Sequence, residues 1–357
     1  TRSCATKRCG ARAMRSSTLR IWGVMTNVTL MAVPLFIFMG VMLEKSGLAE
    51  DLLETMGLLF GRVRGGLTLS VVLVGGLLAA TTGVVGATVV TMGVIALPAM
   101  LKHGYEKELA TGTIAAAGTL GQLIPPSIIL VLLGDVLGVP VGKLFAAAVV
   151  PGLLLIGLFI AYIVVYCWWR PRAAPVLDRQ LLNAHPDRSL GLRVAKSLLP
   201  PLTLVIAVLG SIFFGIASPT ESAALGALGA MLLAATHQRL TLANLVDTMR
   251  STTRLTSMVF IILVGASAFG LVFRGLHGDN LVHGFMTTLP GGMWGFLAVS
   301  MLVIFVLGFF LDFLEIVFIV VPILVPIAVH LGLDMAWFAI LIALNLQSSF
   351  LTPPFGF

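Results

Sequence analysis

Two pairs of prolines interrupt segments of the chain that are otherwise apolar. Pro125-Pro126 and Pro353-Pro354 each remove two backbone donors and clash with the preceding turn, so each pair must break a helix and release carbonyl oxygens. Freed carbonyls cannot face lipid, so they must line a cavity inside the protein or bind a cation. Oxygen ligands that carry no fixed negative charge suit a hard monovalent ion such as sodium. The alternative is a proline kink whose carbonyls are satisfied by neighbouring hydroxyl groups, and the presence of two breaks favours the ion site.

Small and polar residues surround both breaks. The segment Gly118-Thr119-Leu120-Gly121 adds backbone flexibility before the first break, and Ser127 follows it. Amide and hydroxyl side chains crowd the second break, and they are Asn345, Gln347, Ser348, Ser349 and Thr352.

Two long apolar stretches are also interrupted near their middle. Thr81-Thr82-Gly83 divides residues 65–101, and Asp312 and Glu315 divide residues 293–331. A carboxylate at the centre of a membrane helix costs about 2.5–3.5 kcal/mol, so the two acidic residues are candidates for a functional role. The alternatives are a helix contact between small residues at the first interruption, and an ion pair or a water-filled tip at the second.

The elements that position these residues must be membrane helices. The 357-residue chain is 58% hydrophobic and only 10% charged. Soluble domains are about 25% charged, so the composition excludes a cytosolic enzyme, a disordered protein and a nucleic-acid-binding protein. Because the apolar runs are long enough to span a bilayer, we predict an all-α polytopic membrane protein.

The predicted elements form two halves joined by a polar linker over residues 170–196. The first half, residues 21–169, contains a span (21–43), an interfacial helix (47–63), a re-entrant hairpin (65–101), a broken helix (109–133) and a span (145–169). The second half, residues 197–357, contains spans at 198–217, 222–236 and 255–273, a polar stretch at 237–254, a re-entrant hairpin (293–331) and a broken helix (335–357).

The distribution of basic residues orients these elements. If both long stretches return to the side from which they start, 14 Lys and Arg residues fall in connections on one side, and only Lys143 and Arg274 fall on the other. The richer side faces the cytoplasm, which makes the linker cytoplasmic. Residues 1–20 carry six basic residues and no acidic one, and they violate this orientation. We expect them to be a tail that replaces a first helix, and we expect a final span to follow residue 357.

The two halves are related by a shift of 228 residues. This shift places Pro98 on Pro326, Gly104 on Gly332, and the first proline pair on the second. Proline and glycine set backbone shape, so their matching register indicates a repeated structure. In the predicted topology the two copies enter from opposite faces, which is the architecture of secondary transporters. Duplicated membrane packing without transport is the alternative.

Four motifs carry a family resemblance, namely ALPAMLKHGY (96–105), GTLGQLIPPSI (118–128), SPTE (218–221) and NLQSSFLTPPFGF (345–357). They resemble the DctM-type large membrane subunit of TRAP transporters. The resemblance runs from about Val33 to Phe357, and residues 1–20 do not fit it. It implies an elevator-type transporter of the ion-transporter superfamily in the bacterial inner membrane, with sodium as the coupling ion and no other cofactor. It also implies a small DctQ-type membrane subunit, a periplasmic solute-binding protein, and a small organic acid as substrate.

The resemblance also implies ligand positions where each hairpin tip meets its broken helix. The implied sodium ligands are Thr82, Gly83, Gly118, Thr119 and Gly121 in the first half, and Asp312, Asn345, Gln347 and Thr352 in the second. Candidate substrate ligands are Thr81, Ser127, Glu315 and Ser349. Many family members carry Ser-Gly-Ser at the first tip. This chain has Thr82-Gly83-Val84, so the second hydroxyl of that motif is absent, and backbone carbonyls become the more important candidate ligands there.

Two other functions stay open at this point. One is a carboxylate or anion transporter of the same superfamily that works without a binding protein. The other is a membrane-embedded enzyme such as a lipid transferase, but the sequence contains no convergent acid–base set and no metal or nucleotide motif that such chemistry needs.

Overall fold

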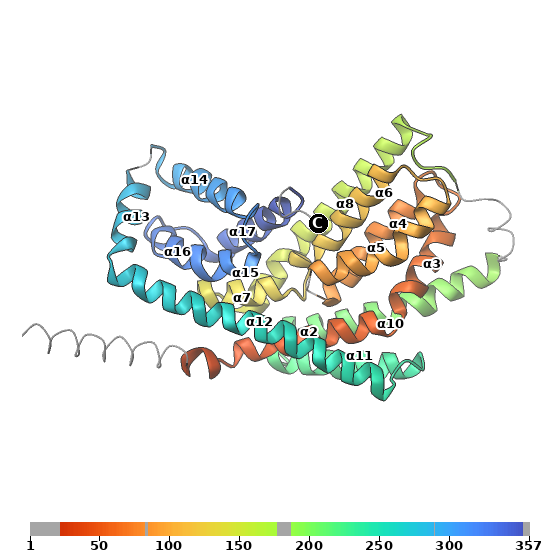
Figure 1. Ribbon diagram of the computed structural model, residues 1–357, viewed down its shortest axis with the longest axis horizontal. Helices are drawn as coiled ribbons and strands as arrows, with labels where there is room; N and C mark the ends of the chain where they lie inside the picture. Colours follow the sequence, from red (N-terminus) through yellow and green to blue (C-terminus); the bar gives the residue numbers. More distant parts are fainter. Residues whose placement is uncertain (1–21, 83–84, 177–186, 289, 353–357) are drawn as a thin grey trace, which may run out of the picture.

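The computed structural model describes residues 22–82, 85–176, 187–288 and 290–352. Every regular element in these four ranges is a helix, which confirms the predicted all-α class (Figure 1). Within them, four helices are long and apolar enough to cross a membrane, and a helix pair bent by 58° counts as a fifth if it forms one span.

The bent pair opens the described chain. It consists of α2 (Ala32–Lys45), preceded by the short η1 (Thr29–Met31), and of α3 (Leu48–Phe60). Gly47 permits the bend, because it adopts φ of 78°. The predicted span over residues 21–43 is wrong at its start, since the helix is interrupted at Asn27. The Asn27 side chain accepts the Thr29 amide at 2.9 Å and donates to Asp135 at 2.6 Å, so it replaces the helical pairing there.

The first long apolar stretch doubles back on itself. Helices α4 (Gly66–Thr82) and α5 (Val85–Lys102) pack against each other, and the Tyr105 hydroxyl accepts the Leu67 amide at 3.3 Å. This bond brings the start of α4 next to the end of α5. The stretch is therefore a helical hairpin.

A broken helix follows, made of α6 (Lys107–Thr119), the 3-10 turn η2 (Leu120–Gln122) and α7 (Ile128–Leu137).

Four long helices connect the two hairpin regions, and they are α8 (Val141–Trp169), α10 (Asp187–Phe213), α11 (Pro219–Thr236) and α12 (Leu242–Gly275). Helix α11 packs against α2 and α10, and α12 packs against α2 (Figure 1). The polar stretch at 237–254 and the span at 255–273 are not separate elements, because α12 runs through both as one 34-residue helix. Backbone hydrogen bonding sustains a helix across a change of polarity, which the hydropathy pattern alone does not reveal.

The second long apolar stretch also returns to its starting end. It consists of α14 (Gly292–Leu307), α15 (Phe313–Glu315), the π-helical turn η3 (Ile316–Val320) and α16 (Val321–His330), with α13 (Gly278–Thr287) before it and α17 (Met335–Ser349) after it. The ring centroids of Trp294 and Trp337 lie 6.5 Å apart, and those of His283 and His330 lie 5.6 Å apart. These contacts place the beginning of α14 beside the residues that follow α16.

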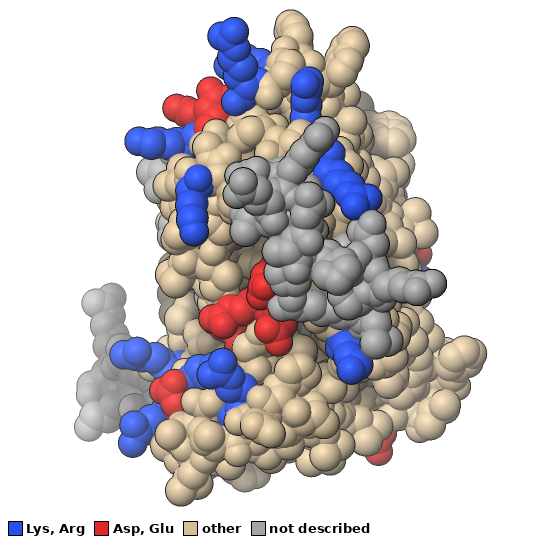
Figure 2. All heavy atoms as spheres, turned by 90° about the vertical axis from the view of Figure 1, so that its right-hand side faces the viewer, with Lys and Arg blue, Asp and Glu red and all other residues tan. Residues whose placement is uncertain are grey.

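Basic side chains gather at one end of the molecule. Figure 2 views the end where α8 finishes and α10 begins, and Lys and Arg side chains are grouped over it. The connections there contact one another, because the Glu106 amide donates to the Ala173 carbonyl at 2.9 Å. This arrangement agrees with the predicted clustering of basic connections on one side.

Candidate functional site

The first broken helix interrupts its hydrogen bonding where the prolines predict. Helix α6 ends at Thr119, η2 continues to Gln122, and helical geometry resumes only at Ile128. Gly121 has a proline at the position four residues on, so its carbonyl has no helical donor at that spacing. The Gln122 carbonyl, in contrast, accepts the Ser127 hydroxyl at 2.6 Å. One of the two freed carbonyls is therefore satisfied by a hydroxyl, as the alternative interpretation of the break requires.

The first hairpin packs tightly on this break. A Cβ atom on Gly118 would lie 2.3 Å from Val89 Cγ2 and 3.0 Å from Val89 Cα, so α6 and α5 are in backbone contact at this point. Helix α4 packs along η2. Thr81 and Thr82 end α4, whereas Gly83 and Val84 lie outside the described residues.

The second hairpin meets the second broken helix in the same way. A Cβ atom on Gly308, just after α14, would lie 2.2 Å from the Ser349 hydroxyl at the end of α17. The Phe313 and Phe350 rings contact each other edge to face at 6.3 Å. Asp312 begins α15 by accepting the Phe313 amide at 2.8 Å, and Glu315 ends that helix. Pro353 and Pro354 lie outside the described residues.

The polar side chains of the second break are engaged in the protein. Asn345 donates to the Met301 carbonyl in α14 at 2.6 Å. The hydroxyls of Ser348, Ser349 and Thr352 donate to carbonyls of the preceding turn, at 2.8, 2.9 and 3.3 Å. These bonds fix the side chains but leave the lone pairs of the hydroxyl oxygens able to accept or to coordinate.

The two broken helices start at opposite ends of α8. Glu106, before α6, accepts the Tyr166 hydroxyl at 3.1 Å near the end of α8. Asp334, before α17, pairs with Lys143 at 3.5 Å near the beginning of α8. The 29 residues of α8 span about 43 Å at about 1.5 Å per residue. Helices α6 and α17 therefore approach the middle of the molecule from opposite directions.

Their C-terminal ends meet at one buried hydrogen bond. The Gln347 side-chain amide donates to the Thr119 hydroxyl at 2.8 Å. These two residues are 228 positions apart, which is the shift that relates the two halves. Because Thr119 and Gln347 are equivalent positions in the two halves, their contact lies on the pseudo-twofold axis that relates one half to the other. The sequence predicts both residues as ligands but does not predict that they bind each other.

Sequence reasoning missed two residues. Gln122 has a fully buried side chain, and neither its nitrogen nor its oxygen has a hydrogen-bond partner among the residues that the structure describes. A glutamine in an apolar run beside a proline pair was the available signal. Glu44, at the end of α2, accepts the Thr91 hydroxyl of α5 and so joins a connecting helix to the first hairpin. Nothing in the local sequence around Glu44 indicates this contact.

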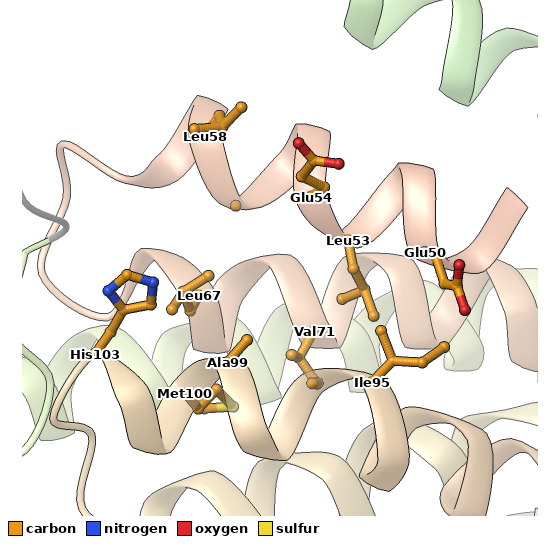
Figure 3. A pocket seen from close by; sticks show the side chains of 12 residues that line it. Glu50, Leu53, Glu54, Leu58, Leu67, Val71, Ile95, Ala99, Met100 and His103 are labelled. Atoms are coloured by element: carbon orange, nitrogen blue, oxygen red, sulfur yellow. The ribbon is translucent and has the colours of Figure 1, made fainter. Parts of the chain in front are cut away.

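A separate apolar pocket of about 300 Å³ lies between α3 and the first hairpin. Figure 3 shows Leu53, Val71 and Ile95 pointing into it, with Glu50 and His103 at its ends. None of the predicted ligand residues lines this pocket, so it is distinct from the junction of the two breaks.

The comparison with known proteins decides the family. Residues 9–357 match the family described as the tripartite ATP-independent periplasmic transporter, DctM component. The chain belongs to the DctM family. The match begins at residue 9, so it takes in residues 9–20, which the motif resemblance leaves out.

Relatives of the DctM-family chain are named as transporter permeases. The C4-dicarboxylate TRAP transporter large permease of Pseudomonas aeruginosa is 33% identical over 345 residues, covering 96% of this chain and 79% of the relative. The sialic acid large permease of Vibrio cholerae is 31% identical, covering 94% of this chain and 77% of the relative. The isethionate permease DctMQ of Oleidesulfovibrio alaskensis is 31% identical, and the match covers 92% of this chain and 51% of that protein.

Membership of the DctM family establishes a multi-pass membrane transporter. It also confirms that this protein is not an enzyme, because the family consists of permeases. The recognition made from four motifs is thus confirmed across nearly the whole chain.

Proposed function

We propose that this protein imports a small organic acid across the bacterial inner membrane, driven by a sodium gradient. The observation that carries the proposal is the meeting of both broken helices at Thr119 and Gln347, with each hairpin packed on the break of its own half. Broken helices that approach each other from opposite directions inside the protein are the setting in which transporters bind coupling ions and substrate.

The residues present at the two breaks suit sodium. The Gly121 carbonyl has lost its helical donor, and the proposed ligands of the first half offer only neutral carbonyl and hydroxyl oxygens. In the proposal, Thr82, Gly83, Gly118, Thr119 and Gly121 form the first site, and Asp312, Asn345, Gln347 and Thr352 form the second. Bound sodium supplies positive charge that favours the binding of a carboxylate between the hairpin tips, where Thr81, Ser127, Glu315 and Ser349 are the proposed ligands.

The movement proposed is that of an elevator. Both hairpins are re-entrant in this proposal, and they travel with the broken helices as one body against α2, α10, α11 and α12. Two features support it. The Thr119–Gln347 bond ties the two broken helices together, and α11 packs with α2 and α10. The Glu44–Thr91 bond and the packing of α2 on α4 and of α12 on η3 join the two groups in this structure, and these contacts must change for such a movement.

Two further proteins complete the proposed transporter. A small DctQ-type membrane subunit is supported by the relative named DctMQ, and a periplasmic solute-binding protein is supported by the tripartite, periplasmic description of the family. The binding protein delivers the acid, so it sets much of the selectivity.

The decisive experiment is uptake into proteoliposomes that contain this chain with its small subunit, supplied with the binding protein. We expect accumulation of the acid with an inward sodium gradient, and none when potassium replaces sodium. Equal uptake in both salts would contradict sodium coupling. Omitting the binding protein separates the two transporter hypotheses, because undiminished uptake would establish the binding-protein-independent mode instead.

A further inference from the structure

The side-chain amide of Gln122 is buried and unpaired. Its relative exposure is 0%, and its two donor hydrogens and its acceptor oxygen are all unsatisfied. An unpaired amide in the interior costs about 1–3 kcal/mol per group, so its presence indicates a partner other than the residues that the structure describes.

A second unpaired atom belongs to Gln347. The oxygen of the Gln347 amide is buried and has no partner, although the nitrogen of that amide donates to Thr119. Thr119 and Gln122 are three residues apart across the 3-10 turn η2, and side chains at this spacing lie on the same face of such a helix. Thr119 therefore brings the two glutamine amides to the same place.

The unsatisfied atoms define the chemistry of the missing partner. A cation would satisfy the two amide oxygens but not the Gln122 nitrogen. A carboxylate would satisfy that nitrogen but neither oxygen. A hydroxyl group satisfies both kinds of atom, because it accepts one hydrogen bond and donates another. The Thr119 hydroxyl cannot serve, since it already donates to the Ala116 carbonyl and accepts from Gln347.

We propose that Gln122 and Gln347 form a buried amide site that binds the hydroxyl group of the transported acid, so that hydroxy acids are the preferred substrate class. The Gln122 nitrogen donates to the hydroxyl oxygen, and the hydroxyl hydrogen goes to the oxygen of Gln347 or of Gln122. When the Gln347 oxygen accepts this hydrogen bond it does not bind sodium, and the second proposed sodium site then consists of Asp312, Asn345 and Thr352. This inference rests on the proposed function, because it places the acid at the junction of the two breaks. A buried water molecule offers the same hydrogen bonds, and the experiment must separate the two.

The test measures binding of matched acids to the chain in lipid nanodiscs by isothermal titration calorimetry in sodium chloride. Lactate is compared with propionate, and malate with succinate, since each pair differs by one hydroxyl. We expect the hydroxy acid to bind at least about tenfold more tightly in each pair, and we expect Gln122→Leu to abolish this ratio without weakening the binding of propionate or succinate. Thr113→Val is the matched control, because it removes a buried hydroxyl of α6 that bonds only to the Leu109 carbonyl of its own helix; it leaves the ratio unchanged.

Two outcomes overturn the proposal. Equal binding of the two acids in both pairs means that the amides hold buried water only, whereas no binding of any acid contradicts the carboxylate site of the proposed function as well. If Gln122→Leu still binds the hydroxy acids more tightly than their matched acids, a group other than Gln122 binds the hydroxyl. Thermal unfolding in sodium and in potassium chloride, without any acid, tests sodium binding separately, so failure of the hydroxyl site and failure of the proposed function are distinguishable.

Discussion

The two halves of this protein share a backbone frame but fill it with different side chains. Gly104 and Gly332 are equivalent, and both adopt left-handed φ angles, of 77° and 74°. The residue after each glycine donates its amide to the carbonyl five residues before it. The Tyr105 amide bonds to Met100 at 3.1 Å, and the Leu333 amide bonds to Ala328 at 3.0 Å. Where α17 ends, however, the buried Phe350 ring packs on Phe313, whereas its counterpart in the first half is the unpaired amide of Gln122. Backbone geometry is thus duplicated at these glycines, whereas the side chains at the ends of the broken helices differ in chemistry.

The largest effect should come from replacing the side chains at these two equivalent positions. We expect Phe350→Ala to destabilise the protein by about 3–5 kcal/mol, because it leaves a cavity against Phe313. We expect Gln122→Leu to stabilise it by about 1–3 kcal/mol in the absence of acid, because it removes an unpaired buried amide. Thermal unfolding in nanodiscs measures both changes, and a stability loss in Gln122→Leu would show that the amide has a partner within the protein.

The two hairpin contacts should differ in whether they can be rescued. Gly118→Ala and Gly308→Ala each insert a methyl group into a contact shorter than 3 Å and should cost about 1–3 kcal/mol. At Gly308 the obstacle is the Ser349 side chain, so adding Ser349→Gly should restore the unfolding temperature. At Gly118 the Val89 Cα atom remains at 3.0 Å, so adding Val89→Ala should restore it only in part. Equal rescue in both halves would mean that the close approach at Gly118 is not made by backbone.

Removing either partner of the Thr119–Gln347 hydrogen bond should cost a different amount of stability. Thr119→Val leaves the Gln347 amide without any partner, while Gln347→Leu leaves Thr119 bonded to the Ala116 carbonyl. We therefore expect Thr119→Val to be the more destabilising change, by about 1 kcal/mol. A double-mutant cycle on unfolding measures the coupling, and a coupling energy near zero would remove the bond as a link between the halves.

The smallest difference concerns the first turns of α6 and α17. The Trp337 amide donates to the Asp334 carboxylate at 2.9 Å, and this bond, followed by nearby Lys143, lowers the pKa of Asp334. Its counterpart Glu106 makes no cap bond and reaches Tyr166 instead. A lowered pKa gives a contribution that is present above the ordinary value of 3.8 and is lost as pH falls through the folded value. Acid should therefore loosen the start of α17 before that of α6, and amide hydrogen exchange below pH 4 measures the order. Asp334→Asn, which keeps a capping oxygen, is the control that should lose the pH dependence.

Much of the frame could be predicted from the sequence because prolines and glycines act locally. Pro125-Pro126 predicts the break after α6, and the structure has it between Gln122 and Ile128. The charge pattern predicts that both long stretches return to their starting ends, and the Tyr105–Leu67 bond and the Trp294–Trp337 contact agree. The hydropathy pattern predicted the helix ends wrongly at two places. At Asn27 the helix is interrupted because the side chain bonds to the backbone. Along α12 the helix continues through a polar stretch, because a helix needs only its own backbone bonds to continue.

The site was harder to predict because its decisive contacts join distant residues. Thr119 and Gln347 are recognisable singly from the motifs, but their bond depends on how α6 and α17 meet. Gln122 lies inside a motif that served for recognition, and only its burial without a partner draws attention to its amide. Whether the remaining ligands hold sodium stays a prediction for the uptake experiment.

The π-helical turn at Ile316–Val320 gives the second hairpin arm a different winding from the first. The equivalent positions 88–92 lie in regular α5, and both arms have the same number of residues between the tip and the proline at 98 or 326. A π turn takes up one more residue than an α turn, and each residue advances a helix by about 100°. Phe313 therefore projects from its arm at an azimuth shifted by about 100° from that of Val85. Equal spacing along the chain thus yields side chains that face different directions, and in the second arm Phe313 is turned so that it packs on Phe350.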